Sequence, residues 1–288
     1  MRPENPTITD RTQLQSYINE RSTDIDGRLG VFIAFPEPDG SFDVVAANNP
    51  ETAFASASVI KLPILHSLYD QHENDLAKLT EPHGLKDLNR VSGSGLFHLL
   101  GDVTPSLRDL ARAMISISDN SATNELIDYL GFETINDQTE LLGMTETQLQ
   151  RRMMVTLDDD LIPKFQVDNG PANTVAPRGC VQFFSDLVRE ETLSAAAYEE
   201  LRVPLNEQKY ISNFPRYLPY ETHIEHKTGT LPSAAFDTGL VVAGDATQER
   251  PLLYAIFVDK MDQGADGADL IAELGAAVYD WLAPFSAS

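Results

Sequence analysis

The sequence predicts an α+β protein with one sheet built from both ends of the chain. Short β-rich apolar segments occur near the N-terminus and again near the C-terminus, and a long block of helical periodicity separates them. This order of strands, a helical block and strands again indicates an α+β protein in which the helical lobe is inserted between the two ends of one sheet. We expect a sheet lobe of residues 1–54 plus 216–288, an inserted all-helical lobe of residues 55–215, and an active site in the cleft between them.

The first predicted elements are a helix and a hairpin. Residues 10–22 place Leu14 and Ile18 on one helical stripe. Two β-rich segments follow at residues 29–35 and 42–47, and the loop between them contains prolines and a glycine. This pattern predicts a β-hairpin.

The middle of the chain is predicted to be helical, and strands return at its end. Apolar residues at helical spacing predict helices over residues 58–71, 106–116, 122–130, 132–142, 175–188 and 195–205. Short β patterns separated by turn residues occupy residues 222–230, 235–242 and 252–258. An amphipathic helix over residues 268–283 closes the chain, so that late strands and a late helix are available to join the N-terminal hairpin.

The chain is strongly acidic, with 44 Asp and Glu against 21 Lys and Arg and a net charge of −23. Phosphate binding requires basic patches, so nucleic acid is not expected as a partner. Only 7 of the basic residues are lysines, and an acid-rich, lysine-poor surface suits high salt. A halophilic source and an acidic mesophilic source are both compatible with this composition.

No membrane, disulfide or metal chemistry is expected. No stretch approaches the roughly 20 apolar residues of a membrane span. The N-terminus lacks the apolar core of a secretion signal, so the sequence as written predicts a cytoplasmic protein, with a secreted mature form left open. The single cysteine, Cys180, excludes an intrachain disulfide. The histidines lack metal-ligand spacing, so no metal or other cofactor is predicted, and the oligomeric state is left open.

Ser58 and Lys61 form the first of three motifs that carry chemistry. Ser58 opens a helical pattern, and Lys61 lies three residues later on the same face. A serine hydroxyl needs an adjacent base to act as a nucleophile, and a lysine desolvated among apolar neighbours is such a base. A capping serine beside a surface lysine is the structural alternative, but Val59, Ile60 and Leu62 make a poor setting for a surface lysine.

Two further motifs follow. The segment 118–120, Ser-Asp-Asn, joins two predicted helices, where taken alone it is typical of a turn or helix cap. The segment 227–229, Lys-Thr-Gly, lies on a predicted strand, where the glycine would let a ligand approach the backbone closely. An edge strand with a lysine that prevents aggregation is the alternative for this segment. Each motif is weak evidence when taken alone.

In this order, the three motifs resemble those of class A β-lactamases and penicillin-binding proteins. The resemblance extends over roughly residues 10–285. It implies a β-lactamase/transpeptidase-like fold, with a sheet of about five antiparallel strands from both chain ends flanked by the first and last helices. It also implies a serine hydrolase that forms an acyl-Ser58 intermediate from a β-lactam or a related small-molecule acyl donor. Lys61 would help to take the proton of Ser58, Ser118 would relay a proton to the leaving nitrogen, and Lys227 would supply positive charge near the substrate carboxylate.

The resemblance further implies a set of substrate-binding residues. Asn120 would hydrogen-bond the amide side chain of the substrate, and Thr228 and Thr230 would offer hydroxyls to its carboxylate, beside Gly229 at the strand backbone. The oxyanion hole would use the backbone N–H groups of Ser58 and Thr230. Two such donors would lower the barrier by several kcal/mol.

The sequence departs from the class A pattern on the loop that follows the helical block. Class A enzymes carry a glutamate there, which activates the water that deacylates the serine. No glutamate occurs between Glu146 and Glu190, and the carboxylates available are those of Asp158, Asp159, Asp160 and Asp168. An aspartate is one methylene shorter, and a solvated acidic loop is the favoured interpretation of these four. We therefore expect slow β-lactam hydrolysis with the acyl-Ser58 form accumulating.

Asp237, on the predicted strand 235–242, is a second departure, because class A enzymes often have a basic residue there to hold the substrate carboxylate. His226 should point to the opposite face of its strand from Lys227 and is predicted to be structural. Three functions remain open at this point: a β-lactamase, a D,D-peptidase or esterase of the same fold, and a penicillin-binding or sensor protein that is acylated without turnover.

Overall fold

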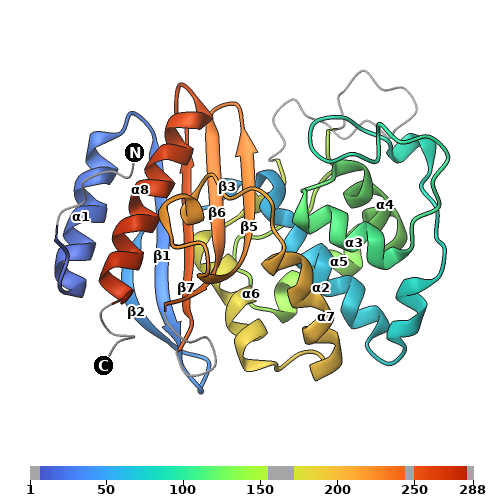
Figure 1. Ribbon diagram of the computed structural model, residues 1–288, viewed down its shortest axis with the longest axis horizontal. Coiled ribbons are helices and arrows are strands. Elements are labelled where there is room, and N and C mark those ends of the chain that lie inside the picture. Colours follow the sequence, from blue (N-terminus) through green and yellow to red (C-terminus); the bar gives the residue numbers. More distant parts are fainter. Residues whose placement is uncertain (1–6, 155–171, 244–249, 284–288) are drawn as a thin grey trace.

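Strands from both ends of the chain form one five-stranded antiparallel sheet in the computed structural model, which describes residues 7–154, 172–243 and 250–283 (Figure 1). The strand order is β2-β1-β7-β6-β5. The strands are β1 (Arg28–Pro36), β2 (Phe42–Asn48), β5 (His223–Leu231), β6 (Ala234–Val242) and β7 (Leu252–Asp259). The predicted hairpin therefore lies beside the last strand, which confirms the expected α+β architecture.

The central pairing joins β1 to β7 over most of their length. Arg28 lies opposite Asp259 in the register, and its guanidinium donates two hydrogen bonds to that carboxylate, at 2.9 and 2.5 Å. Such a bidentate pair has a specific geometry as well as a favourable charge interaction. It therefore helps to define the register between the two ends of the chain.

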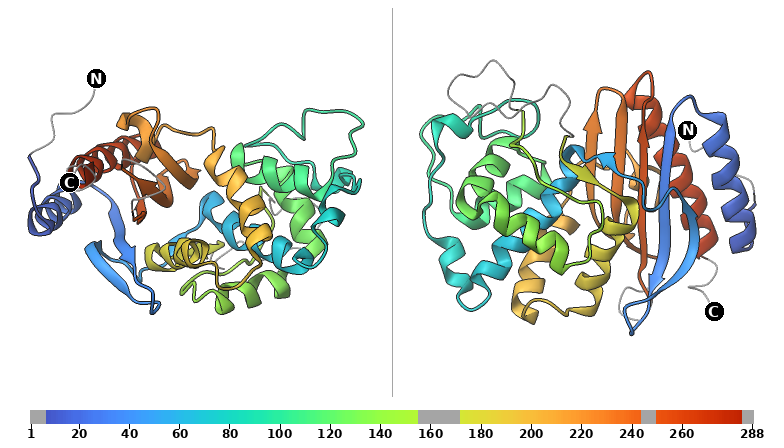
Figure 2. Two further views of the ribbon diagram at one scale, coloured as in Figure 1. Left: turned by 60° about the horizontal axis from the view of Figure 1, so that its bottom comes forward. Right: turned by 180° about the vertical axis from the view of Figure 1, so that it is seen from behind.

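Helices cover both faces of the sheet. The first helix, α1 (Arg11–Asp24), and the last, α8 (Gly264–Leu282), lie side by side on one face, and α6 (Pro177–Arg189) packs on the other (Figures 1 and 2). Residues of β1 alternate between two apolar cores: Val31 and Ile33 belong to the core under α1 and α8, and Phe32 and Ala34 to the core shared with the other helices.

The remaining helices form the inserted helical lobe. They are α2 (Lys61–His72), α3 (Leu107–Ser116), α4 (Asn120–Leu130), α5 (Phe132–Leu141) and α7 (Ala195–Asn206). Helix α2 contacts all four of the others, and ten of its residues are buried. A lysine on such a helix has no path to solvent along the helix surface, which explains why Lys61 is fully buried.

The predicted helices and strands match the structure within a few residues at their ends. The shortest elements were not predicted. Strand β3 (Phe54–Ala55) pairs with β4 (Thr174–Val175), and a 3-10 turn, η1 (Ala57–Ile60), leads into α2. Two residues cannot display a periodicity, so strands of this length depend on tertiary pairing.

A substitution at Gly239, with Gly101 as the control, tests how tightly β5 packs against β6. A Cβ on Gly239 would lie 2.4 Å from the carbonyl oxygen of Glu225 and 2.6 Å from the Cβ of His226, whereas a Cβ on Gly101 would meet no atom within 4 Å. We expect Gly239→Ala to lower the free energy of unfolding by about 1–3 kcal/mol, because the backbone must shift. The matched Gly101→Ala should be neutral or slightly stabilising. Urea unfolding of both variants measures the difference, and equal stabilities would contradict this packing.

Candidate active site

Ser58 lies in η1, the short turn that leads into α2. The residue before it, Ala57, has a φ of 45°, and Ser118 has a φ of 55°. Residues other than glycine rarely adopt this left-handed conformation, which costs of the order of 1–3 kcal/mol and is most often retained at functional sites. Both serines of the predicted motifs are therefore adjacent to, or part of, strained backbone.

The strand β5 passes close to η1 because Gly229 has no side chain. A Cβ at this position would lie 3.0 Å from the Cβ of Ala57 and 3.3 Å from the backbone nitrogen of Ser58. Since β5 is an edge strand, its backbone groups on the side away from β6 are not used in the sheet. The absent side chain of Gly229 thus lets the backbone of this edge strand approach Ser58 closely.

The Lys61 amine lies fully buried against the Ser-Asp-Asn segment. Its Nζ donates to the carbonyl oxygen of Ser118 at 2.7 Å, to the hydroxyl of Ser118 at 3.0 Å and to Oδ1 of Asn120 at 2.9 Å. Helix α4 begins at Asn120, and the Asp119 side chain caps it by accepting from the backbone N–H of Ala122. The helix cap therefore holds the two residues that contact Lys61.

Lys227 reaches the same hydroxyl from the sheet. Its Nζ donates to Oγ of Ser118 at 3.0 Å and to the carbonyl oxygen of Thr228 at 2.7 Å, and its side chain is also fully buried. The Ser118 hydroxyl is consequently placed between two lysine amines, one from α2 and one from β5. A hydroxyl both donates and accepts, so this arrangement can pass a proton from one side of the site to the other.

Burial lowers the pKa of both lysines. The pKa of Lys61 is held well below its usual range by burial first and by the charge of Lys227 second, with Asp119 opposing the shift. Burial lowers the pKa of Lys227 to about 7, and the charge of Asp237 opposes that shift. A lowered pKa makes the neutral amine, with its free lone pair, easier to reach, and the neutral amine can serve as a general base.

One pocket of about 560 Å³ contains most of the predicted site residues. This volume is within the range of small-molecule sites. Its walls include Ser58, Ser118, Asn120, Thr228, Gly229 and Thr230. Lys61 and Lys227 lie directly behind the wall, where each contacts Ser118.

The sequence did not identify several residues of the pocket wall. Met153 and Met154 precede the undescribed segment, Ser94 belongs to a glycine-rich loop, and Tyr210 follows α7. None of them carries a motif, and they meet only through the tertiary fold. The backbone of Met153 is held by Asn124, whose Oδ1 accepts from its N–H at 2.7 Å and whose Nδ2 donates to its carbonyl at 3.1 Å.

Asp237 does not line this pocket. Its fully buried carboxylate accepts hydrogen bonds from the Tyr254 hydroxyl at 3.0 Å and from the backbone N–H of Phe214 at 3.1 Å, and Nδ1 of His226 lies 3.0 Å from it. Asp237 is thus part of a buried network with His226. The structure agrees with a structural role for His226. The aspartates at 158, 159, 160 and 168 lie outside the described residues.

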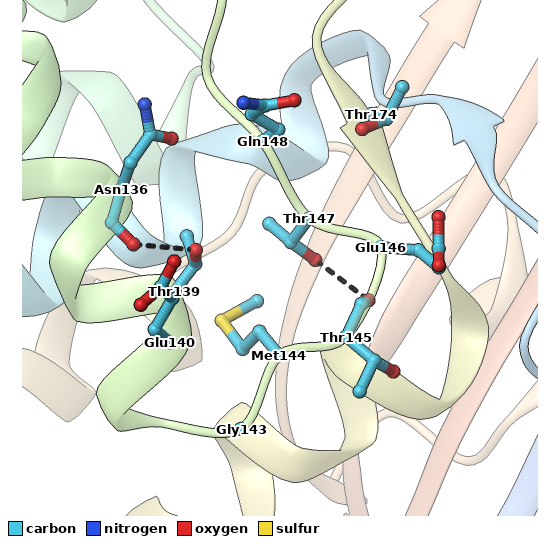
Figure 3. A pocket seen from close by; sticks show the side chains of 10 residues that line it. All are labelled: Asn136, Thr139, Glu140, Gly143, Met144, Thr145, Glu146, Thr147, Gln148 and Thr174. Atoms are coloured by element: carbon cyan, nitrogen blue, oxygen red, sulfur yellow. Dashed lines mark hydrogen bonds between the residues drawn. The ribbon is translucent and has the colours of Figure 1, made fainter.

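A second cavity of about 460 Å³ lies beside α5 (Figure 3). Three of its threonine hydroxyls are already hydrogen-bonded: Thr139 donates to the carbonyl of Asn136, Thr147 to that of Thr145, and Thr145 to the carboxylate of Glu51. The described residues that line this cavity include no serine, lysine, histidine or cysteine, so it has no set of groups for acyl transfer.

Within the described ranges, no three His, Cys, Asp or Glu side chains are grouped as a metal site would need. Among the helices of those same ranges, none combines the length and apolar character of a membrane span.

Comparisons with known proteins agree with this geometry. The chain is 26% identical over 189 residues to a beta-lactamase of Bacteroides uniformis, a match that covers 62% of this chain and 61% of that protein, which is less than two thirds of its length. Its fold is similar to that of the solved beta-lactamase from Sphaerobacter thermophilus, with a TM-score of 0.80, 25% identity and coverage of 93% of this chain and 96% of that one.

Two further solved structures share the fold. A representative of class A beta-lactamase from Bacteroides cellulosilyticus has a TM-score of 0.81 at 21% identity, with 96% of this chain and 100% of that one covered. A mutant of PBP-A, solved as its acyl-enzyme complex with penicillin G, has a TM-score of 0.77 at 23% identity, with 96% and 98% covered. The model of the beta-lactamase enzyme family matches residues 13–282, so this chain belongs to the beta-lactamase enzyme family.

Proposed function

We propose that this protein is a serine hydrolase that opens β-lactams through an acyl-Ser58 intermediate. The observation that carries the proposal is the Ser118 hydroxyl, which lies 3.0 Å from each of two buried lysine amines and in the same pocket as Ser58. We place this pocket in a cleft between a sheet lobe (1–54 plus 216–288) and a helical lobe (55–215).

Acylation follows from the roles that these groups can take. The neutral amine of Lys61 accepts the Ser58 proton as Oγ attacks the lactam carbonyl. The backbone N–H groups of Ser58 and Thr230 stabilise the oxyanion. As the carbon–nitrogen bond breaks, Ser118 gives its proton to the leaving nitrogen and is reprotonated by Lys61. The products of this step are an ester on Ser58 and a free amine, and the lysine returns to its neutral state.

Substrate binding uses the rest of the wall. The charged form of Lys227, together with the hydroxyls of Thr228 and Thr230, attracts the substrate carboxylate, and Asn120 bonds the amide side chain. The buried position of the Asp237 carboxylate, away from the pocket wall, supports this assignment, because this acid then does not face the substrate.

Deacylation is the step that the site supports least. A water molecule must be activated by a base in the pocket, and Met153 and Met154, which form the described wall from the 150–154 segment, carry no proton acceptor of useful basicity. We therefore propose that a β-lactam adduct accumulates. The same site would turn over a D,D-peptide or an ester whose acyl-enzyme is intrinsically more reactive, and that activity is the second candidate function.

Covalent labelling tests the nucleophile. Ser58→Ala should abolish the mass increase that penicillin produces on the intact protein, because no other hydroxyl in the site is followed by a buried lysine one turn later. Ser118→Ala should retain the adduct but lower its rate of formation by about 10²–10⁴-fold, as expected when a general acid is lost. A Ser58→Ala protein that still forms the adduct would contradict the assignment, and the absence of an adduct in the wild-type protein with any penicillin would favour the peptidase or esterase.

The pKa of Lys227 predicts how binding depends on pH. The lysine is charged below about pH 7 and neutral above it, and a bound carboxylate favours the charged form. Binding is therefore tightest below pH 7 and weakens as the pH rises, by at most roughly tenfold per pH unit. Titration of the Ser58→Ala protein with a penicillin measures this without acylation. The methyl ester of the same penicillin should show little dependence, and parallel curves for acid and ester would contradict the role of Lys227.

A carboxylate introduced at position 153 should convert accumulation into turnover. Met153→Glu places a general base on the pocket wall, on a backbone already held by Asn124, and we expect deacylation to be faster by about tenfold or more. Met153→Gln has the same shape without the basic group and serves as the matched control. Equal deacylation rates in the two variants would show that residue 153 does not face the reacting water. Rapid turnover in the wild type that is lost on replacing one of the four loop aspartates would instead place the base on that loop.

A further inference from the structure

We propose that Tyr210, held in place by Ser94, determines which leaving groups the pocket accepts. This inference rests on the proposed function and extends it to the substrate class: acyl donors with a compact leaving portion, such as fused five-membered rings, over those with a bulky substituent on the leaving side. Neither residue belongs to the three motifs.

A hydrogen bond between these residues crosses the pocket wall. The Tyr210 hydroxyl lies 3.1 Å from Oγ of Ser94, and Oγ of Ser94 donates to the carbonyl oxygen of Ile117, also at 3.1 Å. A serine hydroxyl has one proton, so Tyr210 is the donor in the first bond. The bridge therefore joins the loop before α3 to the segment after α7 and ends on the residue that precedes Ser118.

The segments that contain Ser94 and Tyr210 are both hydrogen-bonded to the same stretch of backbone, residues 115–120. On one side, the N–H of Asn120 donates to the carbonyl of Ser94 at 3.1 Å, and a Cβ on Gly95 would lie 2.4 Å from Cα of Asp119, so this loop cannot move toward α4. On the other side, the N–H of Lys209 donates to the carbonyl of Ser116 at 2.9 Å.

The segment that contains Tyr210 has a second attachment. Nε2 of Gln208 donates to the carbonyl of Ile115 at 2.8 Å, and Oε1 of the same side chain accepts from the N–H of Tyr210 at 3.1 Å. Because residues 115–120 hold both sides, the bridge has a defined position relative to the Ser118 hydroxyl.

The position of the bridge assigns it to one side of the pocket. Ser94 contacts Ile117, next to the hydroxyl that protonates the leaving nitrogen, whereas a Cβ on Gly93 would lie 2.9 Å from Nδ2 of Asn120 and 3.2 Å from Sδ of Met154. Since the proposed role of Asn120 is to bond the amide of the acyl chain, we assign the side of Asn120 and Met154 to the acyl chain, and the side of Tyr210 and Ser94, next to Ile117, to the leaving group.

The tyrosine also offers an apolar face there. Tyr210 lines the pocket and is 42% exposed as a residue, so part of it is open to a substrate. A compact apolar leaving ring can pack on this face. A long substituent on the leaving side would instead meet the hydrogen-bonded bridge, and it could be accommodated only if that bond were broken.

The test compares two cephalosporins that share the same acyl chain and differ at position 3, one with a methyl group and the other with a heteroarylthiomethyl group. The second-order rate constant for acylation of Ser58 is measured by intact mass for each compound. The readout is the ratio of the two constants, because any loss of folded protein lowers both equally.

Tyr210→Ala should shift the ratio toward the bulky compound by about tenfold or more. Tyr210→Phe and Ser94→Ala each remove the same hydrogen bond and should give smaller, similar shifts, and the double variant should show no further gain because the bond is lost only once. Tyr220→Ala, at a tyrosine that is 97% exposed and not part of the pocket wall, is the matched control and should leave the ratio unchanged.

The inference and the proposed function fail in different ways. A wild-type protein that is acylated by both compounds while Tyr210→Ala keeps the wild-type ratio within twofold would overturn the inference and leave the proposed function intact. A wild-type protein that forms no adduct with either cephalosporin or with any penicillin would overturn the proposed function, and with it the inference.

Discussion

The site depends on the burial of two lysine amines around one serine hydroxyl. Moving an ammonium group out of water is costly unless it is paired or fully hydrogen-bonded. Among the residues that the structure describes, no carboxylate lies within ion-pair distance of Lys61 or Lys227, and both amines are satisfied by serine, threonine and asparagine oxygens. Such neutral partners leave the charged forms poorly compensated, so the pKa of each lysine falls. The base that serine chemistry requires is thus a consequence of how the core is packed.

Hydrogen bonds of neighbouring residues stabilise that arrangement. Ser118 adopts a left-handed backbone conformation, which the neighbouring Asp119 stabilises by capping α4 and by accepting from the backbone N–H groups of Leu96 and Phe97. On the sheet side, Asp237 of β6 contacts His226 of β5 and Tyr254 of β7. These contacts hold in place β5, the strand that carries Lys227. The strain near the reacting groups is therefore balanced by hydrogen bonds one residue or one strand away.

The pocket combines the residues of the three motifs with wall residues that no motif identifies. The residues around Ser58 are those that the motifs identify, whereas the wall contains methionines on one side and the Tyr210–Ser94 bridge on another. The proposed acylation thus uses the motif residues, whereas the proposed fate of the adduct depends on the wall. Members of one family can share the first step and differ in the fate of the adduct, because the wall residues can change without disturbing the buried lysines.

The sequence by itself determined the α+β class, the placement of nearly every long helix and strand, and the residues of the three motifs, because periodicity and short-range motifs are local properties. It could not reveal β3 and β4, which pair only across 120 residues of chain. Nor could it show that Asp237 faces a buried histidine rather than the pocket. The tertiary structure alone decided that Lys61 from α2 and Lys227 from β5 reach one hydroxyl, and that Ser94 and Tyr210 bond to each other at the pocket wall. Contacts between residues so far apart in the chain arise from the packing of helices against a sheet edge, and no local pattern encodes their distances.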